Sequence, residues 1–255
     1  SEPFHERGQA QPPRFRPCLP PDRQAWMILT SNLPAIAEKA RAAKTVLDVG
    51  GGRHPLNLAT HVMDLRPFAE DGSHGSLDPT HERRFSAETW VIHDACVGPW
   101  PFPDKAFDFT FCSHLLEDVR DPIAVCKELI RVSKAGYIET PSREREIFSK
   151  ARGFGLRTAL GAMPELGFNH HRWFVEIEGG HVRFTAKDQR LYQKSDRYIT
   201  RFDLGRKMTE RESGAFLFWE GGFTFEEAFI DDAGEDLSAY RAKALTRLKA
   251  SAPPS

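Results

Sequence analysis

Three consecutive glycines, Gly50 to Gly52, come directly after a short apolar run and constrain this chain more than any other feature. Residues 46–49 read Val-Leu-Asp-Val, a β-branched composition that predicts a buried parallel strand. Glycine is needed where the backbone turns sharply and approaches a ligand, because a Cβ would stand in the way. Asp48 lies at the carboxyl end of this strand, the edge where open α/β sheets bind ligands.

A second expected strand, residues 61–63, ends on Asp64. An acidic residue in this position is well placed to accept both hydroxyls of a ribose. A phosphate-binding loop would show a Lys-Ser/Thr pair or a third glycine that opens a long helix, but His54 and Pro55 stand there instead. The glycines alone would favour an ordinary turn, whereas the two acid-bearing strands favour a pocket for a nucleoside without a pyrophosphate.

These motifs resemble those of the class I S-adenosylmethionine-dependent methyltransferases, in particular the methyltransferase type 11 domains. The first motif of that class is an acidic residue followed by x-Gly-x-Gly, which Asp48, Gly50 and Gly52 match, and Asp64 matches its ribose-binding acid. The resemblance covers residues 45–141 and continues in order through segments 91–95, 101–108, 113–119 and 121–122. It implies an α/β fold, a Rossmann-like, mostly parallel sheet flanked by helices, with S-adenosylmethionine as cofactor.

The resemblance also implies roles for single residues. Asp94 would accept a hydrogen bond from the adenine amino group, and the backbone N–H of Ala95 would meet a ring nitrogen. Ser113 ends the expected strand 107–112, where the resemblance places the reaction centre. The expected cofactor-binding residues are Asp48, Gly50, Gly51, Gly52, Asp64, Asp94, Ala95 and Ser113.

Three histidines are the catalytic candidates, because histidine is best poised to take a proton from an oxygen nucleophile near neutral pH. His114 has the best location, directly after Ser113. His170 and His171 qualify if residues 169–184, an expected β-hairpin, close over the pocket as an inserted lid. The hairpin could equally be an ordinary packing element, and a single histidine is more often structural than catalytic.

Two further expectations concern the ends of the predicted sheet. Residues 216–219 and 223–230 predict a closing antiparallel β-hairpin. The connection from Gly52 to Asp64 is too short for the long helix of the class, since a crossover normally takes a dozen or more residues, so we expect about one helical turn there. Residues 1–21 predict an extended arm, followed by a single methyltransferase domain (22–255) with an insertion at about 153–214.

Composition narrows the class of partner. The net charge is −1 and the pI about 6.8, so we expect no nucleic-acid partner. The sequence has no apolar stretch of about 18 residues and no apolar signal-peptide core, which predicts a cytoplasmic protein without a membrane partner. Glu117, Asp118 and Asp121 could suggest a magnesium cluster, but entry into a helix and its capping explain them more simply, and we expect no metal. The sequence sets no oligomeric state.

The sequence therefore predicts methyl transfer from S-adenosylmethionine to an oxygen or nitrogen of a small polar metabolite, with a sugar as one candidate. Glu139, at the end of an expected strand, could orient a sugar hydroxyl or an amine. Two alternatives stay open. One is a methyltransferase-like protein that binds a cofactor or a partner without turnover, and the short connection from Gly52 to Asp64 is compatible with it. A nucleotide-dependent oxidoreductase or epimerase would want a third glycine and a Tyr-x-x-x-Lys pair, and this chain has neither.

Overall fold

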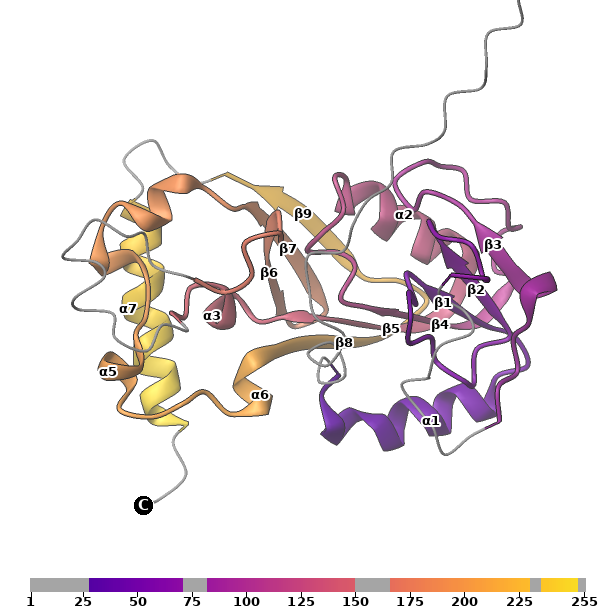
Figure 1. The fold of residues 1–255 in the computed structure, drawn as a ribbon, viewed down its shortest axis with the longest axis horizontal. Coiled ribbons are helices and arrows are strands. Elements are labelled where there is room, and N and C mark those ends of the chain that lie inside the picture. Colours follow the sequence, from indigo (N-terminus) through magenta and orange to yellow (C-terminus); the bar gives the residue numbers. More distant parts are fainter. Residues whose placement is uncertain (1–27, 71–81, 150–165, 230–234, 252–255) are drawn as a thin grey trace, which may run out of the picture.

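The computed structural model describes residues 28–70, 82–149, 166–229 and 235–251. Its six-stranded main sheet runs from the right-hand side of the molecule toward the middle in Figure 1. The strand order is β3-β2-β1-β4-β5-β8; the first five strands are parallel and β8 is antiparallel to β5. The strands are β1 (Val46–Val49), β2 (His61–Asp64), β3 (Trp90–Ile92), β4 (Phe107–Ser113), β5 (Ser133–Pro141) and β8 (Gly214–Glu220). This confirms the predicted Rossmann-like α/β class. The arm predicted at residues 1–21 lies outside the described residues.

Helices cover both faces of the sheet because its central strands are apolar on both sides. On one face, α1 (Leu33–Ala42) buries Ile36 and Ala40 in a core cluster with Val46 of β1. On the other face, α2 (Pro122–Val132) buries Val125 and Leu129. Figure 1 shows these two helices on opposite sides of the sheet.

The start of α2 follows the predicted capping chemistry. Asp121 accepts a hydrogen bond from the backbone N–H of Ala124 (2.9 Å), and Pro122 occupies the first helical position. Because this helix begins directly after the loop that leaves β4, its cap also fixes where that loop ends. Two short 3₁₀ helices, η2 (Thr30–Asn32) and η3 (Ala87–Thr89), precede α1 and β3.

The connection between β1 and β2 contains no helix. Two tight turns replace the single helical turn expected there: His54 N–H donates to Gly51 O (3.0 Å) and Ala59 N–H to Leu56 O (2.9 Å). Leu56, Leu58 and Ala59 are buried in the core cluster that includes α1 residues. Apolar side chains of the loop thus cover the part of the sheet that a crossover helix would cover.

A second, three-stranded sheet contains β6 (Trp173–Glu178), β7 (His181–Ala186) and β9 (Thr224–Ala228). The predicted hairpin is present: β6 and β7 are antiparallel, and Gly179 and Gly180 at the turn have φ of 56° and 81°. Val175, Val182 and Phe184 are at most 1% exposed. The hairpin is therefore a packing element of the core.

The closing antiparallel hairpin is only half present, and this expectation needs correction. β8 joins the main sheet as expected, but β9 pairs in parallel with β7. The chain bends at Gly221, with φ 73°, and Phe223 and Phe225 pack against the core cluster that contains Val182 and Phe184 of β7. Burial of these aromatic rings draws β9 away from β8.

A second lobe, on the left of Figure 1, surrounds the C-terminal helix α7 (Glu235–Ala250). Its core contains Ile147 and Leu166, which precede β6 in the sequence, Phe174 of β6 itself, and Leu237 and Leu248 of α7. Its remaining elements are α3 (Arg143–Glu146), η4 (Gln189–Tyr192), η5 (Ser195–Arg197), α5 (Arg201–Leu204) and α6 (Glu210–Ser213). Among the described residues, no helix combines the length and apolar character needed to cross a bilayer.

Gly136 makes the contact between β4, β5 and β8 sensitive to volume. A Cβ at this position would lie 2.7 Å from Thr110 O and 2.7 Å from the Trp219 ring. We expect Gly136→Ala to lower the free energy of unfolding by roughly 1–3 kcal/mol, because backbone on one side cannot yield. Gly222→Ala is the control, since its Cβ would make only an ordinary contact at 3.5 Å with Ile130. Urea unfolding measures both, and equal stabilities would contradict the packing argument.

Candidate active site

The glycine turn needs glycine at each of its three positions, for different reasons. Gly50 and Gly52 have φ of 75° and 52°, in the left-handed region that glycine adopts readily. A Cβ on Gly51 would lie 2.9 Å from the Cβ of Pro55 and 3.0 Å from an oxygen of Asp48. The turn therefore holds its shape only without side chains.

Two of the predicted carboxylates bind this turn directly. Asp48 Oδ2 accepts from Leu56 N–H (2.7 Å), and Asp64 Oδ2 accepts from Gly52 N–H (2.9 Å). The second oxygen of Asp64 accepts from Arg66 N–H (2.9 Å). Both acids lie at the carboxyl ends of parallel strands, as predicted, and they fix the loop in place of a crossover helix.

Burial changes the acidity of Asp48, which is 1% exposed. Loss of hydration raises the pKa of this carboxyl to about 7; the hydrogen bond from Leu56 opposes the shift, and the charge of nearby Asp64 adds to it. The turn is therefore sensitive to pH near neutrality.

Asp94 also lies at this edge of the sheet, where His93 N–H donates to Asp64 O (2.9 Å). Its carboxylate binds Cys96 N–H (2.9 Å) and the guanidinium of Arg120 (2.6 Å). Partial burial acts to raise the pKa of Asp94, but the bonds from Arg120 and Cys96 outweigh it and lower the pKa below its usual value. Asp94 is therefore ionised, and Arg120 holds its orientation.

A cavity of about 140 Å³ opens beside the glycine turn. Among the predicted residues it brings together Asp48, the three glycines, Ser113 and His114, whereas Asp64, Asp94 and Ala95 are not part of its lining. Phe111 precedes Ser113 by two residues, so strand periodicity could have predicted it. Ile28 carried no sequence signal because it comes from a different part of the chain. The full lining is Ile28, Asp48, Gly50, Gly51, Gly52, Arg53, His54, Phe111, Ser113 and His114.

His114 stands between two buried glutamates. Its Nδ1 lies 3.1 Å from Glu117 Oε1 and its Nε2 lies 3.6 Å from Glu139 Oε1. Burial disfavours the charged ring, but the hydrogen bonds to Glu117 and Glu139 outweigh it and raise the pKa of His114 to about 10. The ring is therefore protonated at neutral pH, with two carboxylates at 1% exposure beside it.

Glu117 corrects the expectation that helix entry and capping explain the acids of this loop. Asp121 is the cap of α2, but Glu117 is buried against His114. Glu139 is held by further bonds: Leu29 N–H donates to its Oε1 (2.8 Å), and the Tyr137 hydroxyl donates to its Oε2. Glu139 is distant from His114 in the sequence, and the register of β4 and β5 brings the two together. No local sequence pattern predicts this pair.

His170 and His171 lie elsewhere, beside Asp118, and neither belongs to the lining of the cavity. The His171 side chain is 1% exposed and its Nδ1 lies 2.7 Å from Glu146 Oε1, whereas the His170 side chain is half exposed. A catalytic role for this pair stays a prediction.

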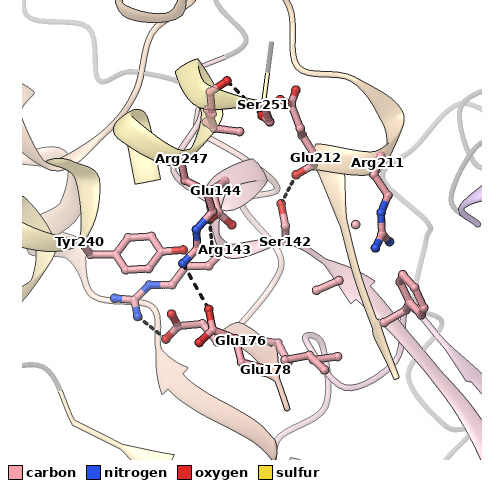
Figure 2. Close-up of a pocket in the computed structure, with 16 residues that line it drawn as sticks. Ser142, Arg143, Glu144, Glu176, Glu178, Arg211, Glu212, Tyr240, Arg247 and Ser251 are labelled. Carbon is pink, nitrogen blue, oxygen red and sulfur yellow. Dashed lines mark hydrogen bonds and ion pairs between the residues drawn. The ribbon is translucent and has the colours of Figure 1, made fainter. Parts of the chain in front are cut away.

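A second cavity of about 370 Å³ lies between α3, β6, the start of β8 and α7 (Figure 2). Charged side chains of both signs face it. Arg247 bridges Glu144 (3.1 Å) and Glu178 (3.2 Å), and the guanidinium of Arg143 lies 3.8 Å from the centre of the Tyr240 ring. Arg247 of α7 therefore lines this cavity in ion pairs with two glutamates.

The two cavities are connected through neighbouring residues. Phe216 lines the charged cavity and pairs with Glu139 of the His114 cluster across β8 and β5. Gly214, another lining residue, packs against Leu29, whose N–H binds Glu139. The charged cavity is thus built onto the same edge of the sheet as the cavity at the glycine turn.

The sheet order, the glycine turn and the acids at the carboxyl edge define a nucleoside-binding α/β protein. Residues 47–138 match the family model described as a methyltransferase domain. This match confirms, over this part of the chain, the predicted resemblance to the class I S-adenosylmethionine-dependent methyltransferases. A search of curated proteins gives no match.

Solved structures with a similar fold share little sequence with the chain. YcgJ of Bacillus subtilis is 18% identical over 43% of this chain and 51% of its own (TM-score 0.27). The PH0226 protein of Pyrococcus horikoshii OT3 is 16% identical over 56% and 66% (TM-score 0.37). The N-terminal domain of EvdMO1, solved in the presence of SAH and D-fucose, is 15% identical over 89% and 73% (TM-score 0.35). The chain covers about half of the two Bacillus structures that it matches, 52% and 51%.

The residues present fit S-adenosylmethionine. Gly52 lines the cavity, and a Cβ there would meet nothing nearer than Gly50 O at 4.0 Å, so the turn leaves room for a ligand beside it. The His114 cluster, with one imidazolium and two carboxylates, carries a net negative charge that suits a cationic ligand.

Replacement of Gly50 should weaken cofactor binding. Alanine costs roughly 1–2 kcal/mol at this left-handed φ, and its Cβ would lie 2.8 Å from the Leu115 side chain, so the turn or that side chain must shift. We expect Gly50→Ala to lower the affinity for the demethylated cofactor at least about tenfold, equivalent to 1.4 kcal/mol. Gly221→Ala is the matched control, because its φ is 73° and its Cβ would contact nothing within 4 Å. Calorimetry should show normal affinity for the control and would contradict the argument if both variants bound equally.

The pKa of His114 predicts how stability depends on pH. The ring titrates near 6.5 in the unfolded chain and near 10 in the folded one. Its contribution to stability is therefore complete below about pH 6.5 and is lost as the pH rises through about 10. His114→Asn tolerates the φ of 52° but cannot carry the proton.

The difference in free energy of unfolding between wild type and His114→Asn should therefore shrink by at least about 1.4 kcal/mol between pH 6 and 10, as measured by urea unfolding. Titration of Asp48 is common to both proteins and cancels. His181→Asn, on a half-exposed histidine of β7, is the control. A difference that stays constant or grows with pH would contradict a protonated His114.

Proposed function

We propose that this chain transfers a methyl group from S-adenosylmethionine to an oxygen or nitrogen of a small polar metabolite, with a sugar as the first candidate. The observation that carries the proposal is the cluster of His114, Glu117 and Glu139 beside the cavity at the glycine turn. These three groups can orient an acceptor and receive its proton.

The chemistry divides between cofactor and protein. The bound cofactor supplies a methyl group already activated by a sulfonium, so the main task of the chain is alignment, which can contribute roughly 7–11 kcal/mol. The His114 cluster holds one proton among three basic groups, and its carboxylates remain able to accept another. Glu117 Oε2 is buried and accepts no hydrogen bond from any described residue, which leaves it available to an acceptor hydroxyl or amine.

The remaining roles follow the family resemblance. Asp64 receives the ribose, and Asp94 with Ala95 receives the adenine. In this assignment Asp48 acts mainly through the loop, because its oxygen holds Leu56 N–H. The glycine turn and Ser113 line the cavity beside His114. The proposed cofactor contacts are those of Asp48, Gly50, Gly51, Gly52, Asp64, Asp94, Ala95 and Ser113.

Two features support a small polar acceptor. The charged cavity of about 370 Å³ is within the size range of small-molecule sites and presents arginine and glutamate side chains together (Figure 2). Arg211 lies over the ring of Phe216, 4.5 Å from its centre, at the end of the cavity built on β8. The net charge of −1 offers no general attraction for nucleic acid.

One observation favours a second function, cofactor binding without turnover. Oxygens of Asp48 and Asp64 already accept hydrogen bonds from the loop backbone. A chain in which these acids serve only the loop would still bind nucleoside in the cavity but would lack a rate advantage. The same experiment distinguishes the two functions.

The test is methyl transfer from radiolabelled S-adenosylmethionine to a panel of sugars, sugar nucleotides and amino acids, with RNA, DNA and protein as separate samples. We expect label in a small-molecule fraction. Glu117→Gln should lower kcat by about 10²–10⁴-fold with little change in cofactor affinity, because it removes a proton acceptor. Glu220→Gln, an exposed position at the end of β8, is the control and should be neutral.

The outcomes separate the proposals. Label found only in macromolecules would overturn the small-metabolite assignment. Cofactor binding without any transfer would favour the non-catalytic function. If neither S-adenosylmethionine nor its demethylated product binds, both functions fail.

A further inference from the structure

We propose that Asp118, His170 and His171 form a binding site for one divalent transition-metal ion, with Zn²⁺ as the first candidate. One ligand atom from each residue lies within 4.8 Å of the others. His171 Nε2 is 3.9 Å from Asp118 Oδ1, and His170 Nε2 is 4.0 Å from Asp118 Oδ2. The proposal is independent of methyl transfer.

The spacing fits a shared ion better than direct bonds. At 3.9 and 4.0 Å the nitrogen and oxygen atoms are too far apart for hydrogen bonds. Ligand atoms at about 2.0–2.2 Å from one ion lie roughly 3–3.5 Å from each other, so the three groups need to close by only about 1 Å. The rings of His170 and His171 are already in contact, with centres 4.4 Å apart, although the residues are adjacent in sequence.

His171 is oriented as a metal ligand requires. Its Nδ1 lies 2.7 Å from Glu146 Oε1, and both side chains are 1% exposed. This bond places the ring proton on Nδ1 and leaves the lone pair of Nε2 facing Asp118. Lys187 Nζ holds the other oxygen of Glu146 at 2.7 Å. A carboxylate behind a histidine is the usual support for a ligand of zinc.

The carboxylate of Asp118 is a second, independent observation that points to a bound cation. Its Oδ1 is buried, and within the described part of the chain it accepts no hydrogen bond. A buried carboxylate oxygen without a partner is costly, and a cation held by the two imidazoles would satisfy it.

The donor set selects the class of ion. Two imidazole nitrogens and one carboxylate oxygen suit Zn²⁺ and other first-row transition metals, whereas Mg²⁺ and Ca²⁺ prefer oxygen alone. Three protein ligands leave at least one position for water or another oxygen ligand. The sequence alone did not indicate that Asp118, His170 and His171 form a group, because Asp118 is far from the two histidines in the sequence.

The ion would join the loop after β4 to the segment before β6. Asp118 follows Glu117 directly, and Glu117 O already accepts from Arg172 N–H (2.7 Å) and Trp173 N–H (3.2 Å). Binding at Asp118, His170 and His171 would therefore brace the backbone of the loop that carries His114, next to the bonds that already connect these segments.

The test uses the full chain, freed of metal by chelation and titrated with Zn²⁺ by calorimetry and with Co²⁺ by visible absorption. We expect one equivalent to bind, with Co²⁺ bands that indicate nitrogen ligands. Asp118→Asn and His170→Gln should each weaken binding at least about tenfold. His181→Gln, on a histidine of β7 that is paired with Glu226 and is not part of the cluster, should not. His170 is half exposed, so its variant keeps the fold where a His171 variant could lose it.

A second readout is thermal. Zn²⁺ at about a hundredfold excess over Kd should raise the Tm of the wild type by roughly 5–10 °C and leave His170→Gln almost unchanged. Absence of saturable binding would overturn the proposal. So would binding that Asp118→Asn and His170→Gln leave intact, which would place the ion at another site.

Discussion

The hydrogen bonds that Asp48 and Asp64 accept from the backbone N–H groups of Leu56 and Gly52 are the interactions on which the rest of the site depends. Without a crossover helix between β1 and β2, no helical ladder holds residues 50–60. Asp48 fixes the far end of the loop through Leu56, and Asp64 fixes its near end through Gly52. Apolar burial of Leu56 and Leu58 then seals the loop against the α1 side of the sheet. The same two acids thus hold the loop, and Asp48 also lines the cavity beside it.

The features that could be predicted from the sequence are those that depend on interactions between residues close together in the chain. Apolar strands closed by glycine or aspartate, the Asp121-Pro122 helix start and the Gly179-Gly180 turn all depend on neighbouring residues, and the structure has each of them. Asp48 and Ser113, on two parallel strands, line the cavity at the glycine turn as strand direction predicted, and their contact with the cofactor stays a prediction.

The remainder could not be predicted because it depends on tertiary packing. Glu139 meets His114 through the register of β4 and β5, and Asp118 meets His171 across more than fifty residues. The pairing of β9 with β7 depends on the packing of Phe223 and Phe225 against distant apolar side chains. No local sequence pattern predicts that packing. The ion pairs of Arg241 with Asp203 and of Arg247 with Glu144 likewise join α7 to residues far away in the sequence.

The path of the chain between its two lobes has a consequence for folding. After β5 the chain builds β6 and β7, returns to the main sheet as β8, contributes β9 to the second sheet and ends as α7 in the outer core. The lobes are interlaced, so no single cut separates them into two self-sufficient pieces. The main sheet gains its last strand only after most of the second lobe has been synthesised. Such distant pairings slow folding, and the main sheet is complete only once β8, residues 214–220, has been synthesised.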